Sequence, residues 1–284
     1  QIEMEFPNRK NELKLIGSYL DNNFYSAPAL YISGPRGCGK SDICRRIVEL
    51  HTHTISTYFL CSGYTTAKQM INSLWHAIVT ACFARSTSSA KASTHAEELL
   101  TKPPGTYHDF AAALRGLIAG SKRLTNLNLI LDHVDISNYL ENKLCSKLLR
   151  LSEFAHAGIK VIAISTKLPV STQSCIMVTF PSYTSIQIEE ILQHILCKGD
   201  KDRNNNLQLS VQIVRPVLKE VLPRLLSITM HIGELREALY FVMNKMRNKP
   251  QNLIHDSNDT AIGVIKELVH LPSMCVKLGE DEKL

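Results

Sequence analysis

Long apolar runs are missing from this sequence of 284 residues. The longest, such as 77–84, is far shorter than the roughly 20 residues that a membrane-spanning helix needs, so we expect no membrane partner. With 13 glycines and 11 prolines, the chain has too few of either for a fibrous or low-complexity protein. The eight cysteines are scattered and form no CxxC pair. That pattern favours reduced thiols over a disulfide or zinc framework.

The amino-terminal residues have neither the basic flank nor the apolar core of a signal peptide, and they lack an initiator Met, so we expect further residues upstream. Hydrophobic residues make up 44% and charged residues 20% of the chain, which excludes wholesale disorder. The 32 basic residues exceed the 26 acidic residues, for a formal net charge of +6. This excess permits binding to phosphate or nucleic acid without demonstrating it.

The first 180 residues alternate between short apolar segments and amphipathic ones. Near-continuous Val, Ile, Leu and Phe are typical of strands buried on both faces of a parallel sheet. The predicted strands are Ala29–Ser33, Ser56–Cys61, Leu127–Asp132, Lys160–Ser165 and Ile176–Phe180, and the predicted helices are Asp42–Leu50, Thr66–Ala84, Tyr107–Ala119 and Leu140–Ala157. This alternation predicts an α/β fold with a doubly wound, five-stranded parallel sheet.

After Phe180 only helical patterns follow, which predicts a small all-α domain. We expect helices at Thr184–Leu196, Leu209–Met230 and Gly233–Met246, the second broken into two pieces by Pro216 and Pro223. Polar stretches at 86–105 and 198–206 predict loops, and 261–270 predicts one more helix. The predicted domains are therefore 1–180, 181–249 and a carboxy-terminal segment, 250–284.

The most specific motif is Gly34-Pro-Arg-Gly-Cys-Gly-Lys-Ser41, which matches the P-loop pattern G-x-x-x-x-G-K-[ST]. Glycine at Gly37 and Gly39 allows the loop to turn back, so that successive backbone N–H groups face phosphate oxygens. The helix expected after Gly39 adds its positive end. Lys40 would bridge the β- and γ-phosphates of ATP, and Ser41 would ligate Mg²⁺.

A second Mg²⁺ anchor is expected at the end of a neighbouring strand, and the run Leu127-Asn-Leu-Ile-Leu-Asp132 ends in a carboxylate. The other interpretation of Asp132 is a cap of the next helix. His51-Thr-His53 resembles a metal-ligand pair, but neither Cys nor carboxylate joins it at useful spacing, and a solvated pair is the simpler interpretation.

A P-loop α/β domain followed by a helical lid resembles the AAA+ ATPases. Further segments resemble the replication-initiator group, and within it the subunit 5 family of the origin recognition complex. These segments are Phe6-Pro-Asn-Arg-Lys-Asn-Glu12, Tyr107-His-Asp-Phe110, Leu148-Leu-Arg-Leu-Ser-Glu-Phe154, the passage from Phe180 to Leu192, and Gly233-Glu-Leu-Arg-Glu-Ala-Leu239. The resemblance implies a nuclear protein that joins the other subunits of the complex and contacts DNA mainly through the assembled complex. It also implies a winged-helix region, so 250–284 is either its beginning or a divergent tail.

The resemblance implies further nucleotide contacts. Arg236 matches the lid arginine that senses the γ-phosphate, and Tyr183 matches a residue that lies against adenine; otherwise they are a solvated helix arginine and an ordinary junction tyrosine. Phe6 and Arg9 belong to the element packed beside the adenine. The expected nucleotide-binding residues are Phe6, Arg9, Gly34, Pro35, Arg36, Gly37, Cys38, Gly39, Lys40, Ser41, Asp42, Tyr183 and Arg236, and the expected Mg²⁺ ligands are Ser41 and Asp132.

Catalytic groups are expected to be missing. Hydrolysis needs a carboxylate that polarises the attacking water, in this family a Glu directly after the magnesium Asp, but here His133 stands there. Ser165-Thr166 replaces the usual water-positioning Asn, and between Ser165 and Phe180 only Lys167 could stand in for an arginine finger. We therefore expect an ATP-binding subunit without turnover and assign no catalytic residue. The alternative is an active ATPase of initiator or clamp-loader type, with Asp135 in place of the missing Glu.

Overall fold

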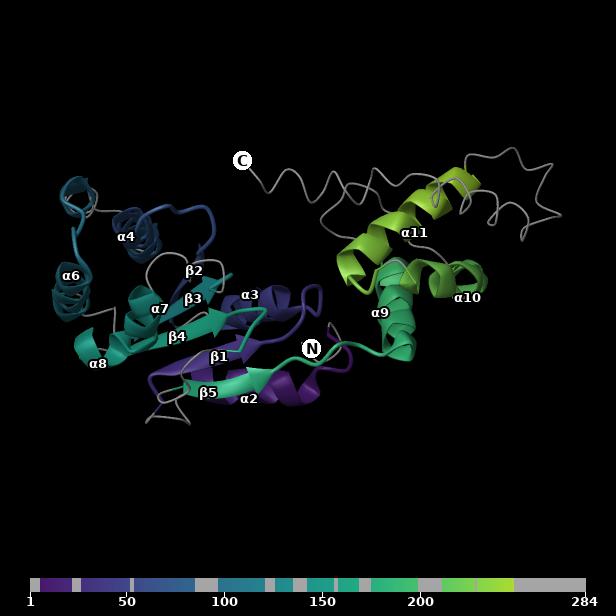
Figure 1. Ribbon diagram of the computed structural model, residues 1–284, viewed down its shortest axis with the longest axis horizontal. Helices are drawn as coiled ribbons and strands as arrows, with labels where there is room; N and C mark the ends of the chain where they lie inside the picture. Colours follow the sequence, from purple (N-terminus) through teal and green to yellow (C-terminus); the bar gives the residue numbers. More distant parts are fainter. Residues whose placement is uncertain are drawn as a thin grey trace. The chain divides into compact units, whose positions relative to one another are not determined.

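The computed structural model describes residues 6–21, 27–51, 54–84, 97–120, 126–134, 142–155, 158–168, 175–198, 211–227 and 229–247. The chain divides into two compact units, Gln1–Ser182 and Tyr183–Leu284. Figure 1 shows a sheet flanked by helices in the first unit and helices alone in the second. Among the helices of the described ranges, none is long and apolar enough to cross a membrane.

A parallel sheet forms the middle layer of the first unit. Its strands are β1 (Ala29–Ser33), β2 (Ile55–Leu60), β3 (Asn126–Asp132), β4 (Gly158–Ile164) and β5 (Cys175–Thr179), in the order β2-β3-β4-β1-β5. All neighbouring pairs are parallel. Each strand lies within two residues of its predicted limits. The predicted doubly wound five-stranded sheet is confirmed.

Helices cover both faces of the sheet. Successive side chains of β1, β3 and β4 point to opposite faces, and these strands are buried along almost their whole length, so both faces must be covered. On one face α4 (Ala67–Ala84), α6 (Tyr107–Gly120), α7 (Asn142–Leu149) and α8 (Leu151–Ala155) enclose a core built around Trp75 and Phe110. These two rings meet edge to face at 6.3 Å. The other face packs against α2 (Lys10–Leu20) and α3 (Lys40–Leu50), as Figure 1 shows.

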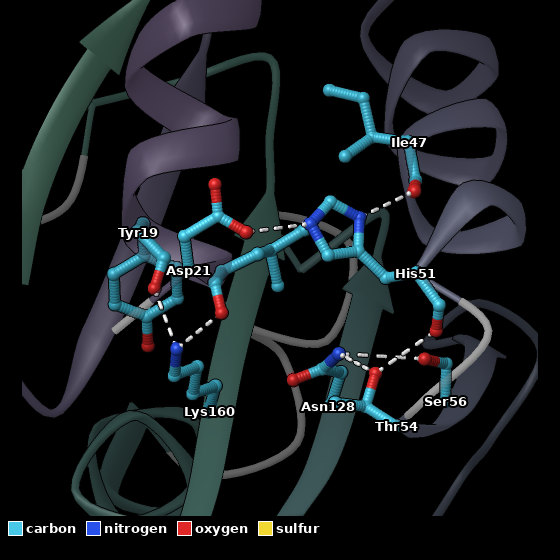
Figure 2. Close-up of polar contacts among 9 residues, drawn as sticks. Tyr19, Asp21, Ile47, His51, Thr54, Ser56, Asn128 and Lys160 are labelled. Atoms are coloured by element: carbon cyan, nitrogen blue, oxygen red, sulfur yellow. Dashed lines mark hydrogen bonds and ion pairs between the residues drawn. The ribbon is translucent and has the colours of Figure 1, made fainter. Parts of the chain in front are cut away.

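The helix α2 was not expected from the sequence, and its carboxyl end is tied to the sheet and to α3 (Figure 2). The Lys160 ammonium of β4 donates to the carbonyl oxygens of Tyr19 and Leu20, at 2.7 and 2.6 Å. Burial lowers the pKa of Lys160 below its ordinary value. His51, at the end of α3, lies 2.9 Å from the Ile47 carbonyl oxygen and 3.1 Å from Asp21 Oδ1. These contacts fix both helices at the end of α3 that lies away from Lys40.

The predicted single helix Leu140–Ala157 is wrong, because the described part of it divides into α7 and α8 at Arg150. The Arg150 N–H donates to the Lys147 carbonyl, and the Glu153 N–H to the Arg150 carbonyl, so the chain turns tightly between the helices. Arg115 of α6 donates to the carbonyl oxygens of Phe154 and Ala155 and so caps the carboxyl end of α8. The break turns α8 onto β4 without changing the helical spacing of the buried leucines.

The second unit contains α9 (Ser185–Lys198), α10 (Val211–Leu226) and α11 (Ile232–Arg247). Thr184 caps α9: its Oγ1 accepts a hydrogen bond from the Gln187 N–H, and Gln187 Oε1 accepts one from the Thr184 N–H. The prediction of two pieces in Leu209–Met230 is wrong, since α10 runs through Pro216 and Pro223. Each proline removes one N–H donor, but Leu218, Val221 and Leu222 on the same helix are buried, and their packing keeps it continuous.

Three further predicted segments lie partly or wholly outside the described residues. Within the segment 86–105, predicted as a loop, residues 97–101 are helical, and 86–96 lie outside the described ranges. The predicted loop at 198–206 lies outside them except for Lys198, which ends α9, and the predicted helix at 261–270 lies outside them entirely.

Candidate nucleotide-binding site

The P-loop leaves the carboxyl end of β1 and leads directly into α3. Gly37 and Gly39 have φ of +74° and +84°, in the left-handed region that glycine enters at no steric cost. Gly39 is the residue before α3, and its carbonyl accepts the Ile43 N–H at 3.0 Å. The first N–H groups of α3, with the positive end of its dipole, therefore belong to the same loop, as a phosphate cradle requires.

Lys40 lies folded against this loop. Its side chain is only 7% exposed, and its ammonium donates to the carbonyl oxygens of Gly34 and Pro35 at 2.6 and 2.7 Å. The buried Cys38 thiol also donates to the Pro35 carbonyl, at 2.9 Å. The loop thus keeps one positive charge within reach of its own backbone, and a phosphate oxygen could take over either carbonyl's role as acceptor.

Four strand ends meet beside the loop because all strands of the sheet run in one direction. After β3 the Val134 N–H donates to the Ile164 carbonyl, after β4 the Ser165 N–H donates to the Ile32 carbonyl, and after β5 the Phe180 N–H donates to the Ser33 carbonyl. The carboxyl ends of β3, β4, β1 and β5 are thereby locked side by side. This arrangement places Asp132 and the P-loop at the same edge of the sheet, with the end of β4 between them.

Asp132 is the carboxylate of this edge, and it is 2% exposed. Its Oδ1 accepts the N–H of His133 at 2.8 Å, and its Oδ2 accepts the hydroxyl of Tyr58. Carboxylate and hydroxyl oxygens are the ligands that Mg²⁺ prefers, and Ser41 stands in the first turn of α3, which packs against β3. The residues present fit a magnesium ion, and Asp132 and Ser41 would hold it.

Tyr58 and Arg45 also belong to this site, although no sequence motif marks either residue. Tyr58 lies on β2 and Arg45 on α3; Arg45 Nη2 donates to the Tyr58 hydroxyl at 2.9 Å, and its guanidinium carbon lies 4.2 Å from the ring centroid. Burial, and then the hydrogen bond to Asp132, raise the pKa of Tyr58 to about 12. The members of this chain of contacts are far apart in sequence, which is why both residues were missed.

The negative charge of Asp132 also reaches α3. The pKa of the fully buried Cys44 thiol is raised well above its ordinary value, first by burial and then by Asp132 and Asp42, while Lys40 opposes the shift. The charges of Asp132, the expected metal ligand, and of Lys40, the P-loop lysine, therefore both act on the pKa of this thiol. This electrostatic coupling agrees with Asp132 and the start of α3 forming one site.

The residue after Asp132 has an unusual backbone. His133 has φ of +58°, in the left-handed region, and its side chain is half-buried. At the end of β4, Ser165 is 2% exposed, and its Oγ accepts the N–H of Lys167 at 3.0 Å. An imidazole and a hydroxyl bound to its own turn therefore occupy the positions where the resemblance leads one to expect Glu and Asn. Asp135 lies outside the described residues.

Arg9 is 2% exposed and joins the start of α2 to the end of β5. It donates to the Pro181 carbonyl at 2.7 Å and to Glu12 Oε1 at 3.2 Å, and its guanidinium carbon lies 5.1 Å from the Phe180 ring centroid. Phe6 is half-buried just before it. The contact of either residue with adenine stays a prediction.

Two predicted nucleotide contacts, Tyr183 and Arg236, belong to the second unit. Tyr183 is buried there, and Arg236 is half-buried on α11 with its Nη2 3.4 Å from Glu237 Oε1. Their contacts with a nucleotide rest on the sequence motifs alone.

The sheet order, the P-loop and the acidic end of β3 define a P-loop nucleotide-binding protein. A family model for the AAA ATPase domain matches residues 5–162, more than half of the chain, and the chain therefore belongs to that family. No curated protein matches the chain by sequence.

Two solved structures show the same fold at low sequence identity. A chain in a structure of the Drosophila origin recognition complex (ORC) bound to DNA is 15% identical, with 96% of this chain and 70% of that chain covered and a TM-score of 0.67. The ORC1 protein of Aeropyrum pernix, in complex with DNA, is 13% identical, with 94% and 69% covered and a TM-score of 0.53. The fold of this AAA ATPase thus resembles that of replication-initiator proteins.

Proposed function

We propose that this chain is an ATP-binding AAA+ subunit that keeps its ATP without hydrolysing it. The observation that carries the proposal is the end of β3. Asp132 is followed by His133, whose backbone N–H turns back onto the Asp132 carboxylate and whose φ is +58°. In the AAA+ ATPases that the sequence resembles, a Glu carboxylate polarises the water beside the γ-phosphate; a neutral imidazole can accept a proton but brings no negative charge to hold that water beside Mg²⁺.

Binding would use groups that the structure already brings together. The N–H groups from Gly37 to Ser41 would hold the phosphates, Lys40 would exchange its carbonyl partners for phosphate oxygens, and Ser41 and Asp132 would hold Mg²⁺. The bound ion would neutralise part of the negative charge on the triphosphate. Phe6, Arg9, Tyr183 and Arg236 are proposed contacts of the adenine and the γ-phosphate on the strength of their motifs.

ATP held in this way would serve assembly. A nucleotide that binds only the folded state stabilises that state, and the stabilisation grows with the logarithm of the ligand concentration divided by Kd. Bound ATP would therefore stiffen the surface on which other subunits dock. We propose that these are the other subunits of a nuclear ORC, that the chain takes the place of subunit 5, and that it contacts DNA mainly through the assembled complex. The fold's likeness to a chain of DNA-bound ORC and the motifs quoted above support this place.

The binding part is tested by calorimetric titration of the purified chain with MgATP. We expect saturable binding to the wild type and at least a tenfold weaker affinity for Lys40→Ala, because the triphosphate loses its buried cation. Lys147→Ala is the matched control, since this exposed lysine of α7 lies outside the loop, and we expect its affinity to match that of the wild type. Absence of binding by the wild type would refute the proposal.

The assembly part is tested by mixing the chain with the remaining ORC subunits, with and without ATP. We expect size-exclusion chromatography to show one complex that forms in ATP and weakens when Lys40→Ala replaces the wild type. A chain that stays apart from those subunits in every condition would refute the proposed partners.

A further inference from the structure

Tyr58 is placed between the surface of α3 and the buried carboxylate of Asp132. Its hydroxyl accepts the Arg45 guanidinium and donates to Asp132 Oδ2, while the His133 N–H donates to Oδ1. Each oxygen of the carboxylate is therefore held by one donor from a different segment of the chain. A carboxylate fixed at both oxygens has a defined plane and direction, which a carboxylate held at only one oxygen does not.

The two donors do not occupy all the acceptor positions of the carboxylate. Each of its oxygens has two acceptor positions, so one position on each oxygen is still available to a metal ion or to its bound water. The contacts therefore orient Asp132 without occupying it completely. They lie behind the proposed Mg²⁺ ligand in the way that outer partners orient metal-binding carboxylates in other proteins.

The sheet makes this arrangement specific to Tyr58. On β2, Leu60 is the residue opposite Asp132, and Tyr58 lies two positions earlier, opposite Ile130. Its side chain reaches along the ladder to the carboxylate, and Arg45 of the adjoining helix supplies the donor behind it. Since α3 also begins with the P-loop lysine, the helix that would bind the phosphates holds the tyrosine that orients the expected metal ligand.

We propose that Tyr58 is a positioning residue for Mg²⁺: with Arg45 behind it, it orients the Asp132 carboxylate and so couples magnesium to ATP binding. This inference rests on the proposed function, since it needs ATP and Mg²⁺ at this site. It predicts that the Tyr58 hydroxyl matters to the magnesium dependence of ATP affinity and little to the affinity for ATP without metal.

The experiment measures the Kd of labelled ATP by equilibrium dialysis, once in excess Mg²⁺ and once in EDTA, and takes the ratio of the two values. Tyr58→Phe removes only the hydroxyl. We expect it to reduce the magnesium-dependent gain in affinity about tenfold, the lower end of the range for losing an outer partner of a metal ligand. The Kd in EDTA should not change. Asp132→Asn should abolish the gain and marks the full effect.

Tyr64→Phe is the matched control, because the same atom is removed from a half-buried tyrosine whose ring stacks on Phe59 at 5.4 Å. We expect its ratio to equal that of the wild type. Arg45→Met keeps the aliphatic stem and removes the donor to Tyr58, and we expect it to reduce the ratio about twofold to threefold, as an exposed contact would. If Tyr58→Phe does not fold, as judged by thermal unfolding, Arg45→Met decides the question by the same ratio.

Two results would overturn the inference alone: a wild-type ratio in Tyr58→Phe, or an equal loss of affinity with and without Mg²⁺, which would show a merely structural role. If the wild type binds no ATP, the proposed function fails and this inference fails with it. If the wild type binds ATP with a magnesium dependence that only Tyr58→Phe, Arg45→Met and Asp132→Asn reduce, the inference is supported.

Discussion

Gly34 is the residue at which the fold and the site depend most sharply on one missing atom. It follows β1 with φ of +150°, and the Phe180 backbone passes directly beside it. A Cβ at this position would lie 2.9 Å from the Phe180 Cβ and closer still to its carbonyl oxygen, although real Cβ atoms essentially never approach other atoms within 3.0 Å. The obstacle is backbone of the neighbouring strand end, so no rotation of a side chain can relieve it.

The cost of Gly34→Ala follows from these contacts. The end of β5 must move away from β1, which weakens the 2.7 Å bond from the Phe180 N–H to the Ser33 carbonyl, worth about 1 kcal/mol. Overpacking adds about 1–3 kcal/mol, and a positive φ on a non-glycine residue adds about 1–2 kcal/mol. We expect the free energy of unfolding to fall by about 3–6 kcal/mol.

Urea unfolding followed by tryptophan fluorescence measures this loss, since Trp75 lies in the core of the same unit. Gly116→Ala is the matched control. Gly116 lies within α6, and a methyl group added there would meet no neighbouring atom within 4 Å, so alanine should stabilise the helix by about 0.5–1 kcal/mol. A Gly34→Ala chain within about 0.5 kcal/mol of the wild type would refute the reasoning, since even the weakened hydrogen bond alone should cost more.

Three further predictions concern stability. Arg9→Met should reduce the free energy of unfolding by about 3 kcal/mol in urea, because Glu12 and the Pro181 carbonyl lose a buried cation, and a loss below about 1 kcal/mol would contradict this role. Lys160→Met should reduce it by about 1–2 kcal/mol and speed amide exchange at the end of α2, whereas unchanged exchange there would argue against the cap. Alkaline pH should destabilise the fold, because burial raises the pKa of Cys82 from 9.0 to about 11 and, with Asp132, that of Tyr58 from 10.0 to about 12. The folded state holds these protons where the unfolded chain has released them, so this stability is complete below about pH 9 and falls as pH rises toward about 12; a Tm that is constant from about pH 8 to 11 would refute this.

Local patterns were sufficient to predict the nucleotide end of the sheet. The apolar strand Ala29–Ser33, the glycines at 37 and 39 and the helix after them are adjacent in sequence, so their geometry follows from residue types alone. Asp132 at a strand end was predictable for the same reason.

Features decided by contacts between distant residues were not predictable. The bond from Tyr58 to Asp132 joins residues 74 apart, and nothing in the sequence near either residue signals it. The break at Arg150 was missed because Leu144, Leu148 and Leu151 keep a helical spacing across it, while the turn depends on packing against β4. At Pro216 and Pro223 the error was the reverse: a break was predicted, but α10 is continuous, since its tertiary burial outweighs the local effect of the prolines.

Whether the bound ATP is hydrolysed is tested by a single-turnover measurement on the purified chain. One equivalent of MgATP, labelled on the γ-phosphate, is mixed with excess protein, quenched in acid at intervals and separated by chromatography, with His133→Glu run beside the wild type. We expect the wild type to return intact ATP over times in which an active AAA+ ATPase would have consumed it. Labelled phosphate released by the wild type at such a rate, with no gain from His133→Glu, would contradict it.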